Sequence, residues 1–228
     1  FFAFSFTASA VYILNDYVDR DFDKLHPEKC KRPLAAGTVS IPLAFTTLAI
    51  LLASAWSVLY WLEPLALYFT IGYFVSNLGY SFIFKKIAYL DLIFISAGFM
   101  LRIFTGAAVA QVPVSNWLIL MTFLLASFLG LAKRRDDLVL FQGTGTAVRK
   151  SIHGYSLPVV RFLLILVGTG LCVTYVMYAG SLDIAARAGG NNVYYTAIFV
   201  VLGYLRYLQL IFSPSKATTP TKVIFRDP

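Results

Sequence analysis

Long, uniformly apolar runs alternate with short polar segments along the whole chain. A bilayer core about 30 Å thick needs about 20 mostly apolar residues per helix. These runs are too long and too evenly apolar for the alternating strands of a transmembrane barrel. We therefore predict an all-α, polytopic transmembrane helix bundle that forms a single domain over residues 1–228. The predicted spans are residues 1–14, 41–62, 64–84, 90–110, 114–132, 157–180 and 192–212.

The composition agrees with this pattern. The chain is 59% hydrophobic and 13% charged, with a mean hydropathy of +0.75, which excludes a soluble enzyme on a doubly wound sheet, a disulfide scaffold and a disordered regulator. The chain also begins without methionine inside an apolar run and ends just after a charged segment. We therefore expect a chain that is shortened at both ends.

The basic residues predict the topology, because Lys and Arg collect in cytoplasmic connections. Fifteen of the 19 Lys and Arg residues fall in alternate connections, whereas the opposite connections contain only Arg187. The cytoplasmic connections at 15–40 and 133–156 are long and polar, so we expect the chemistry on that face. This distribution also accounts for the net charge of +8, and we predict no nucleic-acid partner.

Four aspartates fall within eight residues, just after the first apolar run. On a helix continuing from that run, three of the carboxylates and one amide share about 100° of arc, while Asp21 points away. Like charges this close need a cation among them, and oxygen ligands favour Mg²⁺ or Mn²⁺ over Zn²⁺. The alternative is a solvated loop balanced by neighbouring cations. The predicted metal ligands are Asn15, Asp16, Asp19 and Asp23.

A basic loop, HPEKCKRP over residues 26–33, follows the aspartates. Its two prolines fix a bent, non-helical path that can turn the cations back toward the carboxylates. With a metal ion, Lys29 and Arg32 would neutralise a diphosphate or a sugar phosphate. Taken alone, both residues are equally explained as topological charges.

These residues resemble the first aspartate-rich motif, N-D-x-x-D-x-x-x-D, of the UbiA superfamily of intramembrane prenyltransferases. The loop is similar to the branch of that superfamily that makes decaprenylphosphoryl phosphoribose. The loop positions that fit the branch are Lys24, His26, Pro27, Lys29, Arg32, Pro33, Ala35, Ala36 and Gly37. Further similar segments are Tyr80-Ser81 with Lys85, Asp91, residues 98–102 with Gly106, residues 133–138 and residues 220–227.

The resemblance implies a nine-helix bundle around a cavity open to the cytoplasm, of which about seven helices are present here. It implies Mg²⁺-dependent transfer of a 5-phosphoribosyl group from phosphoribosyl pyrophosphate (PRPP) to a polyprenyl (decaprenyl) phosphate, with release of pyrophosphate. We expect a catalytic domain in a bacterial inner (plasma) membrane with its active site facing the cytoplasm. The oligomeric state is left open.

The implied roles follow the motif positions. Asp16, Asp19, Asp23 and Lys29 are the predicted catalytic residues. Because a polyprenyl phosphate is already an anion, no general base is needed, and His26 is either a phosphate donor or a turn residue. Arg102 lies near mid-span, where a charge costs about 2.5–3.5 kcal/mol, so we expect it to face the cavity. The predicted substrate-binding residues are Asn15, His26, Arg32, Tyr80, Lys85, Arg102, Lys133, Arg134 and Asp137, with Asp137 placed at i+4 to orient Lys133 by an ion pair.

Two other functions remain open at this stage. One is a UbiA-type polyprenyltransferase that moves a prenyl group from a prenyl diphosphate to an aromatic acceptor. Such enzymes usually carry a second D-x-x-x-D motif, where this chain has Lys133, Arg134, Asp136 and Asp137. The other is a membrane transporter, which predicts internal repeats or interrupted helices that the sequence does not display.

Overall fold

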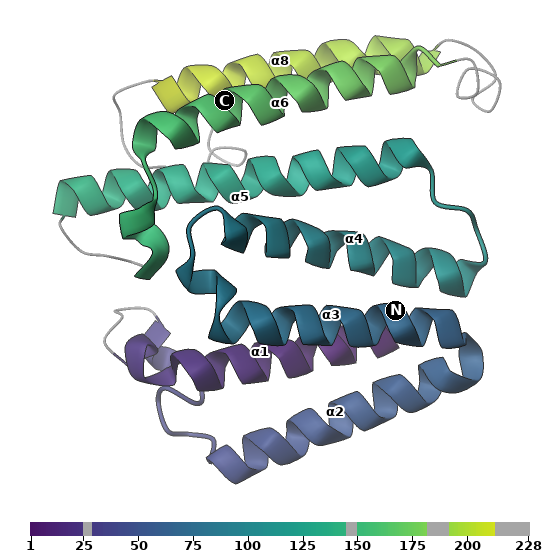
Figure 1. Cartoon of the computed structure of the whole chain (residues 1–228), viewed down its shortest axis with the longest axis vertical. Coiled ribbons are helices and arrows are strands. Elements are labelled where there is room, and N and C mark those ends of the chain that lie inside the picture. The colour runs from purple at the N-terminus through teal and green to yellow at the C-terminus, as the bar shows by residue number, and fades with distance from the viewer. Residues whose placement is uncertain (25–28, 145–149, 182–191, 213–228) are drawn as a thin grey trace. The chain divides into compact units, whose positions relative to one another are not determined.

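The computed structural model describes residues 1–24, 29–144, 150–181 and 192–212, and the chain there is almost entirely helical (Figure 1). No strand occurs in these ranges, so the all-α prediction is confirmed for the described residues. The long helices are α1 (Phe2–Asp23), α2 (Ile41–Leu62), α3 (Pro64–Phe82), α4 (Leu90–Ala110), α5 (Asn116–Thr144), α6 (Leu157–Ala179) and α8 (Asn192–Phe212). Short 3₁₀ helices are η1 (Lys29–Lys31), η2 (Phe84–Lys86) and η3 (Lys150–Gly154).

Within the described ranges, the helices α2, α4, α5, α6 and α8 are long and apolar enough to cross a membrane. The chain is an integral membrane protein. Its described residues form two compact units: unit 1 combines Phe1–Lys85 with Ala97–Val114, and unit 2 combines Lys86–Ser96 with the chain from Ser115 onward. The first turns of α4 therefore belong to unit 2, and the rest of that helix belongs to unit 1.

Unit 1 packs α1 against α2 and α3. Its core brings Ala8 and Val11 of α1 against Tyr73 of α3. The turn between α2 and α3 is a single residue, because Glu63 ends one helix and caps the next by accepting a hydrogen bond from the Leu65 backbone N–H. Proline at the first position of α3 favours this abrupt start, since a helix needs no N–H donor there.

Unit 2 packs α6 against both α5 and α8. Its core gathers Leu92 from α4, Leu131 and Leu138 from α5, and Leu164 from α6. The contact between α6 and α8 is close at Gly168, where an added Cβ would overlap the ring of Tyr204. Glycine at this position lets the two helices approach one another.

The polar segment after residue 132 differs from the prediction of a long loop over 133–156. Helix α5 continues to Thr144. The helical spacing of this segment turns Arg134 and Leu138 toward the interior of unit 2, while Lys133 stays exposed. Arg134 also pairs with Asp137 one turn later, which supports the helical conformation. The basic loop after α1 differs less, since η1 replaces part of the expected non-helical path.

Candidate active site

The carboxylates of α1 line one face of that helix, because the helix continues without a break from its apolar part to Asp23. Asp16 and Asp19 are partly exposed, whereas Asp23 is almost fully buried at 2% exposure. Asp21 points elsewhere: its side chain is exposed and pairs with Lys24, which holds the pKa of that carboxyl below its usual range. The predicted division between one carboxylate face and an outward Asp21 therefore matches the structure.

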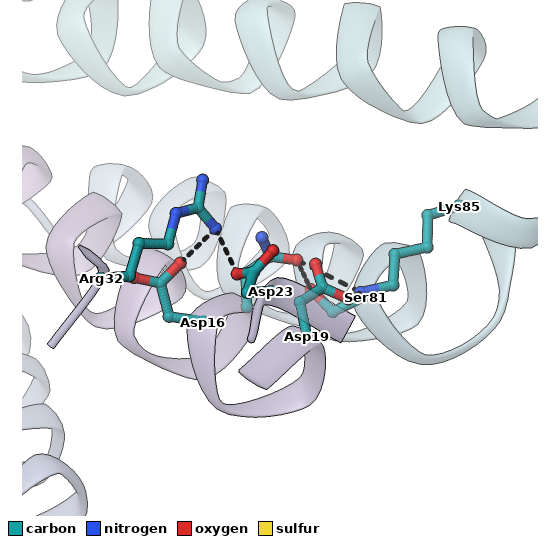
Figure 2. Close-up of polar contacts among 7 residues, drawn as sticks. Asp16, Asp19, Asp23, Arg32, Ser81 and Lys85 are labelled. Atoms are coloured by element: carbon teal, nitrogen blue, oxygen red, sulfur yellow. Dashed lines mark hydrogen bonds and ion pairs between the residues drawn. The ribbon is translucent and has the colours of Figure 1, made fainter. Parts of the chain in front are cut away.

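Arg32 joins the first and last carboxylates of this face. Its Nη1 donates to Asp16 Oδ1 at 2.8 Å and to Asp23 Oδ2 at 2.9 Å (Figure 2). The following turn, in which the Ala36 N–H bonds the Arg32 carbonyl and Gly37 has a φ of +73°, reverses the chain toward α2. The basic loop thus turns a cation back onto the aspartates, as its prolines predicted.

Lys85 reaches the middle carboxylate from η2, just after α3. Its Nζ donates to Asp19 Oδ1 at 2.5 Å and lies 3.5 Å from Asn15 Oδ1 (Figure 2). The buried hydroxyl of Ser81, one turn earlier, also donates to Asn15 Oδ1 at 3.4 Å. Residues of the loop after α1 and of the segment 81–85 therefore converge on one face of α1.

Burial and the neighbouring cations act in opposite directions on the pKa of the Asp16 carboxyl. Burial raises the pKa of Asp16 above its ordinary value, and the two neighbouring aspartates raise it further. The guanidinium of Arg32 opposes this shift, and Lys29 of η1 adds a weaker attraction. Arg32 and Lys85 place positive charge against the carboxylates at the end of a mostly apolar helix, where an unpaired charge would be costly.

The donor set suits a hard divalent cation. In the described ranges, no three Asp, Glu, His or Cys side chains stand close enough to hold a metal ion as they are, and the carboxylates of α1 pair with Arg32 and Lys85 instead. The oxygen atoms of Asp16, Asp19 and Asn15 are partly accessible, and an oxygen-only set is what Mg²⁺ prefers. The residues present therefore fit Mg²⁺ once the cations exchange partners, and the ligand assignment remains a prediction.

Two other predicted substrate residues lie in unit 1 without joining these contacts. Tyr80 is half-buried on the last turn of α3, where it is the next residue, Ser81, that contacts α1. Arg102 is exposed, and its guanidinium stacks over the rings of Phe4 and Phe99 at 5.1 and 5.6 Å. Phe4 and Asp16 are twelve residues apart on α1, about 18 Å along the axis, so Arg102 meets aromatic rings at a distance from the carboxylate face.

The predicted residues of α5 lie in unit 2. Lys133 is exposed, whereas Arg134 is 1% exposed and cannot present its charge at the surface. The Nε of Arg134 donates to Asp91 Oδ2 at 2.9 Å, and its Nη1 donates to Asp137 Oδ2 at 3.1 Å. The structure therefore gives Arg134 a buried, supporting position, and leaves Lys133 and the partly buried Asp137 as the residues of this segment that can meet a ligand.

Two residues that make polar contacts in these clusters were not among the predicted site residues. Ser81 was noted only as part of a resemblance, yet it is the α3 residue that touches Asn15. Tyr155 carried no signal, since no local pattern marks a tyrosine whose hydroxyl donates to Asp91, 64 positions earlier. His26 and the segment 220–227 lie outside the described residues.

Several known proteins are similar to this chain. The chain is 34% identical over 183 residues to the decaprenyl-phosphate phosphoribosyltransferase of Mycolicibacterium smegmatis, covering 80% of this chain and 58% of that protein. It is 30% identical over 209 residues to the Corynebacterium glutamicum protein of the same name, covering 91% of this chain and 63% of that protein. The chain thus spans about three fifths of the length of these relatives.

The solved structure of a UbiA homolog from Archaeoglobus fulgidus, bound to DMAPP and Mg²⁺, has the same fold. It aligns with a TM-score of 0.75 at 16% sequence identity, covering 98% of this chain and 79% of that one. The model of the UbiA prenyltransferase family matches residues 1–226. With its helical fold and the carboxylate face of α1, the chain belongs to the UbiA prenyltransferase family.

Proposed function

We propose that the protein transfers a 5-phosphoribosyl group from PRPP to a polyprenyl phosphate, with Mg²⁺, at the cytoplasmic face of a bacterial plasma membrane. The observation that carries this proposal is the pairing of the α1 carboxylates with Arg32 and Lys85. Such a face offers oxygen ligands for a metal and cations for phosphate in one place. The names of the relatives with 30–34% identity support the choice of donor and acceptor.

The paired groups exchange partners when substrate binds. Asp16, Asp19 and Asp23, with Asn15, would hold Mg²⁺, which when bound neutralises the charge of the leaving pyrophosphate. Arg32 and Lys85, released from the carboxylates, then donate to phosphate oxygens, and Lys29 adds a third cation. In unit 2, Lys133 and Asp137 are further proposed substrate contacts, whereas Arg134 supports them from its buried position.

The reaction needs little beyond electrostatics and orientation. The C1–O bond between ribose and pyrophosphate breaks while an oxygen of the polyprenyl phosphate forms a new bond to C1. The bonding electrons leave with pyrophosphate, and positive charge develops on the ribose ring. Because the nucleophile is already an anion, the cations stabilise the leaving group and no residue must remove a proton.

The test is label transfer in membranes that contain the intact protein. Ribose-labelled PRPP and polyprenyl phosphate are supplied with either Mg²⁺ or EDTA, and label is measured in the lipid extract. Label that appears only with Mg²⁺ supports the proposal. Absence of label, together with prenyl transfer from a prenyl diphosphate to an aromatic acid, would assign the protein to the aromatic branch of the family instead.

A further inference from the structure

A buried ion-pair cluster lies in unit 2, next to Lys133 and Asp137, the two residues proposed there as substrate contacts. Asp91, in the first turn of α4, is fully buried and accepts two hydrogen bonds. The Nε of Arg134 donates to one carboxylate oxygen and the hydroxyl of Tyr155 donates to the other. The cluster therefore ties the start of α4, the polar end of α5 and the segment before α6 to one another.

The Tyr155 phenol is a permanent hydrogen-bond donor in this cluster. Burial, the hydrogen bond to Asp91 and the negative charge of Asp91 all raise the pKa of the Tyr155 phenol far above its ordinary value. The phenol thus stays protonated and remains a donor at any physiological pH. Asp91 in turn is the acceptor for a guanidinium that is always charged.

Stabilisation of the contact between these segments does not by itself explain the cluster. The same segments already meet through apolar contacts among Leu92, Leu131, Leu138 and Ile152. A buried ion pair contributes little net stability compared with apolar residues of similar size, because both charges must be desolvated. What such a pair supplies is a defined geometry, since each lone pair and each N–H has one satisfactory direction.

That geometry reaches the surface of α5 through two neighbours of Arg134. Arg134 Nη1 holds Asp137 Oδ2, and the Asp137 side chain is 14% exposed. Lys133, the preceding residue, is exposed on the adjacent face of the helix. Holding Arg134 in one orientation therefore contributes, together with the apolar core, to the rotation of α5 about its axis and to the direction in which Lys133 projects.

We propose that Asp91 and Tyr155 are positioning residues that hold Arg134, and with it Asp137, so that Lys133 meets a phosphate group of the substrates. This inference rests on the proposed function for the role of Lys133. Neither positioning residue touches substrate; each acts through the end of α5.

The test is a double-mutant cycle in the intact protein. Tyr155→Phe removes one hydroxyl and keeps the ring, so the apolar core stays filled. We expect the affinity for PRPP or pyrophosphate, measured with Mg²⁺ and without acceptor as a shift in thermal unfolding, to fall about tenfold. In a Lys133→Gln background the same change should alter that affinity less than about twofold, because the group it orients is gone.

A control variant separates a role in positioning Lys133 from a role in the stability of the fold. Tyr175→Phe removes a hydroxyl that bonds Thr196 between α6 and α8 in the same unit, and it should leave both affinities unchanged. Lower thermal stability of Tyr155→Phe with unchanged affinity for both ligands, or equal losses with and without Lys133, would overturn the proposal. If the protein binds pyrophosphate through this cycle but transfers no ribose, the proposed function fails while the positioning role stands.

Discussion

The sharpest prediction compares two aspartates that differ by two positions on α1. Asp19→Asn and Asp21→Asn make the same chemical change, but Asp19 pairs with Lys85 on the carboxylate face while Asp21 is exposed beside Lys24. The Asp19 side chain is 32% exposed, so losing its ion pair should cost only about 1 kcal/mol of folding stability. The protein should remain folded, which allows the effect on transfer to be measured directly.

The expected effect on transfer is much larger. Asp19→Asn removes a charge from the face that would hold Mg²⁺ and pyrophosphate, and such a loss typically lowers the rate by about 10²–10³-fold, or about 3–4 kcal/mol of transition-state stabilisation. Asp21→Asn should stay within about twofold of the unchanged protein. The assay is Mg²⁺-dependent ribosyl transfer, normalised to the amount of folded protein in size-exclusion chromatography. Equal losses in both variants, or full activity of Asp19→Asn, would refute the assignment of one catalytic face.

Three further changes test other parts of the structure. Arg32→Gln should lower the free energy of unfolding by about 2–3 kcal/mol, because Asp23 stays buried without its cation, whereas Lys24→Gln, which alters a surface pair, should leave thermal unfolding unchanged. Mg²⁺ and pyrophosphate together should raise the Tm by more than the sum of their separate effects, and purely additive shifts would contradict the exchange of partners. In Lys85→Gln, the affinity for Mg²⁺ alone should rise about tenfold, because no lysine must leave Asp19. Gly168→Ala should lower the free energy of unfolding by about 1–3 kcal/mol through overlap with Tyr204, while Gly170→Ala on the same helix, with open space around the added Cβ, should lower it little, if at all.

Some of these features were predictable because they depend on local sequence. Apolar runs of spanning length determined which segments are helical, and a period of 100° per residue placed three aspartates on one face of α1. The continuation of α5 was not predictable in the same way. Its charged stretch around Arg134 and Asp136 has the composition of a loop, and the partner that accepts the buried Arg134 side chain, Asp91, lies 43 positions away. A distant pairing of this kind leaves no periodic trace in the sequence.

The two charged clusters differ in a way that fits different tasks. On α1, the Arg32 side chain is 38% exposed and one of its two partners, Asp16, is partly open to solvent, so exchanging that ionic partner for another costs little desolvation. Around Asp91, both members of the main ion pair are at most 2% exposed, and breaking it would strand a charge in an apolar interior. A group that must accept and release ligands on every turnover belongs in the first setting, and a group that must keep one orientation throughout belongs in the second. The same residue types, arginine and aspartate, thus provide an exchangeable contact in unit 1 and a permanent one in unit 2 because their burial differs.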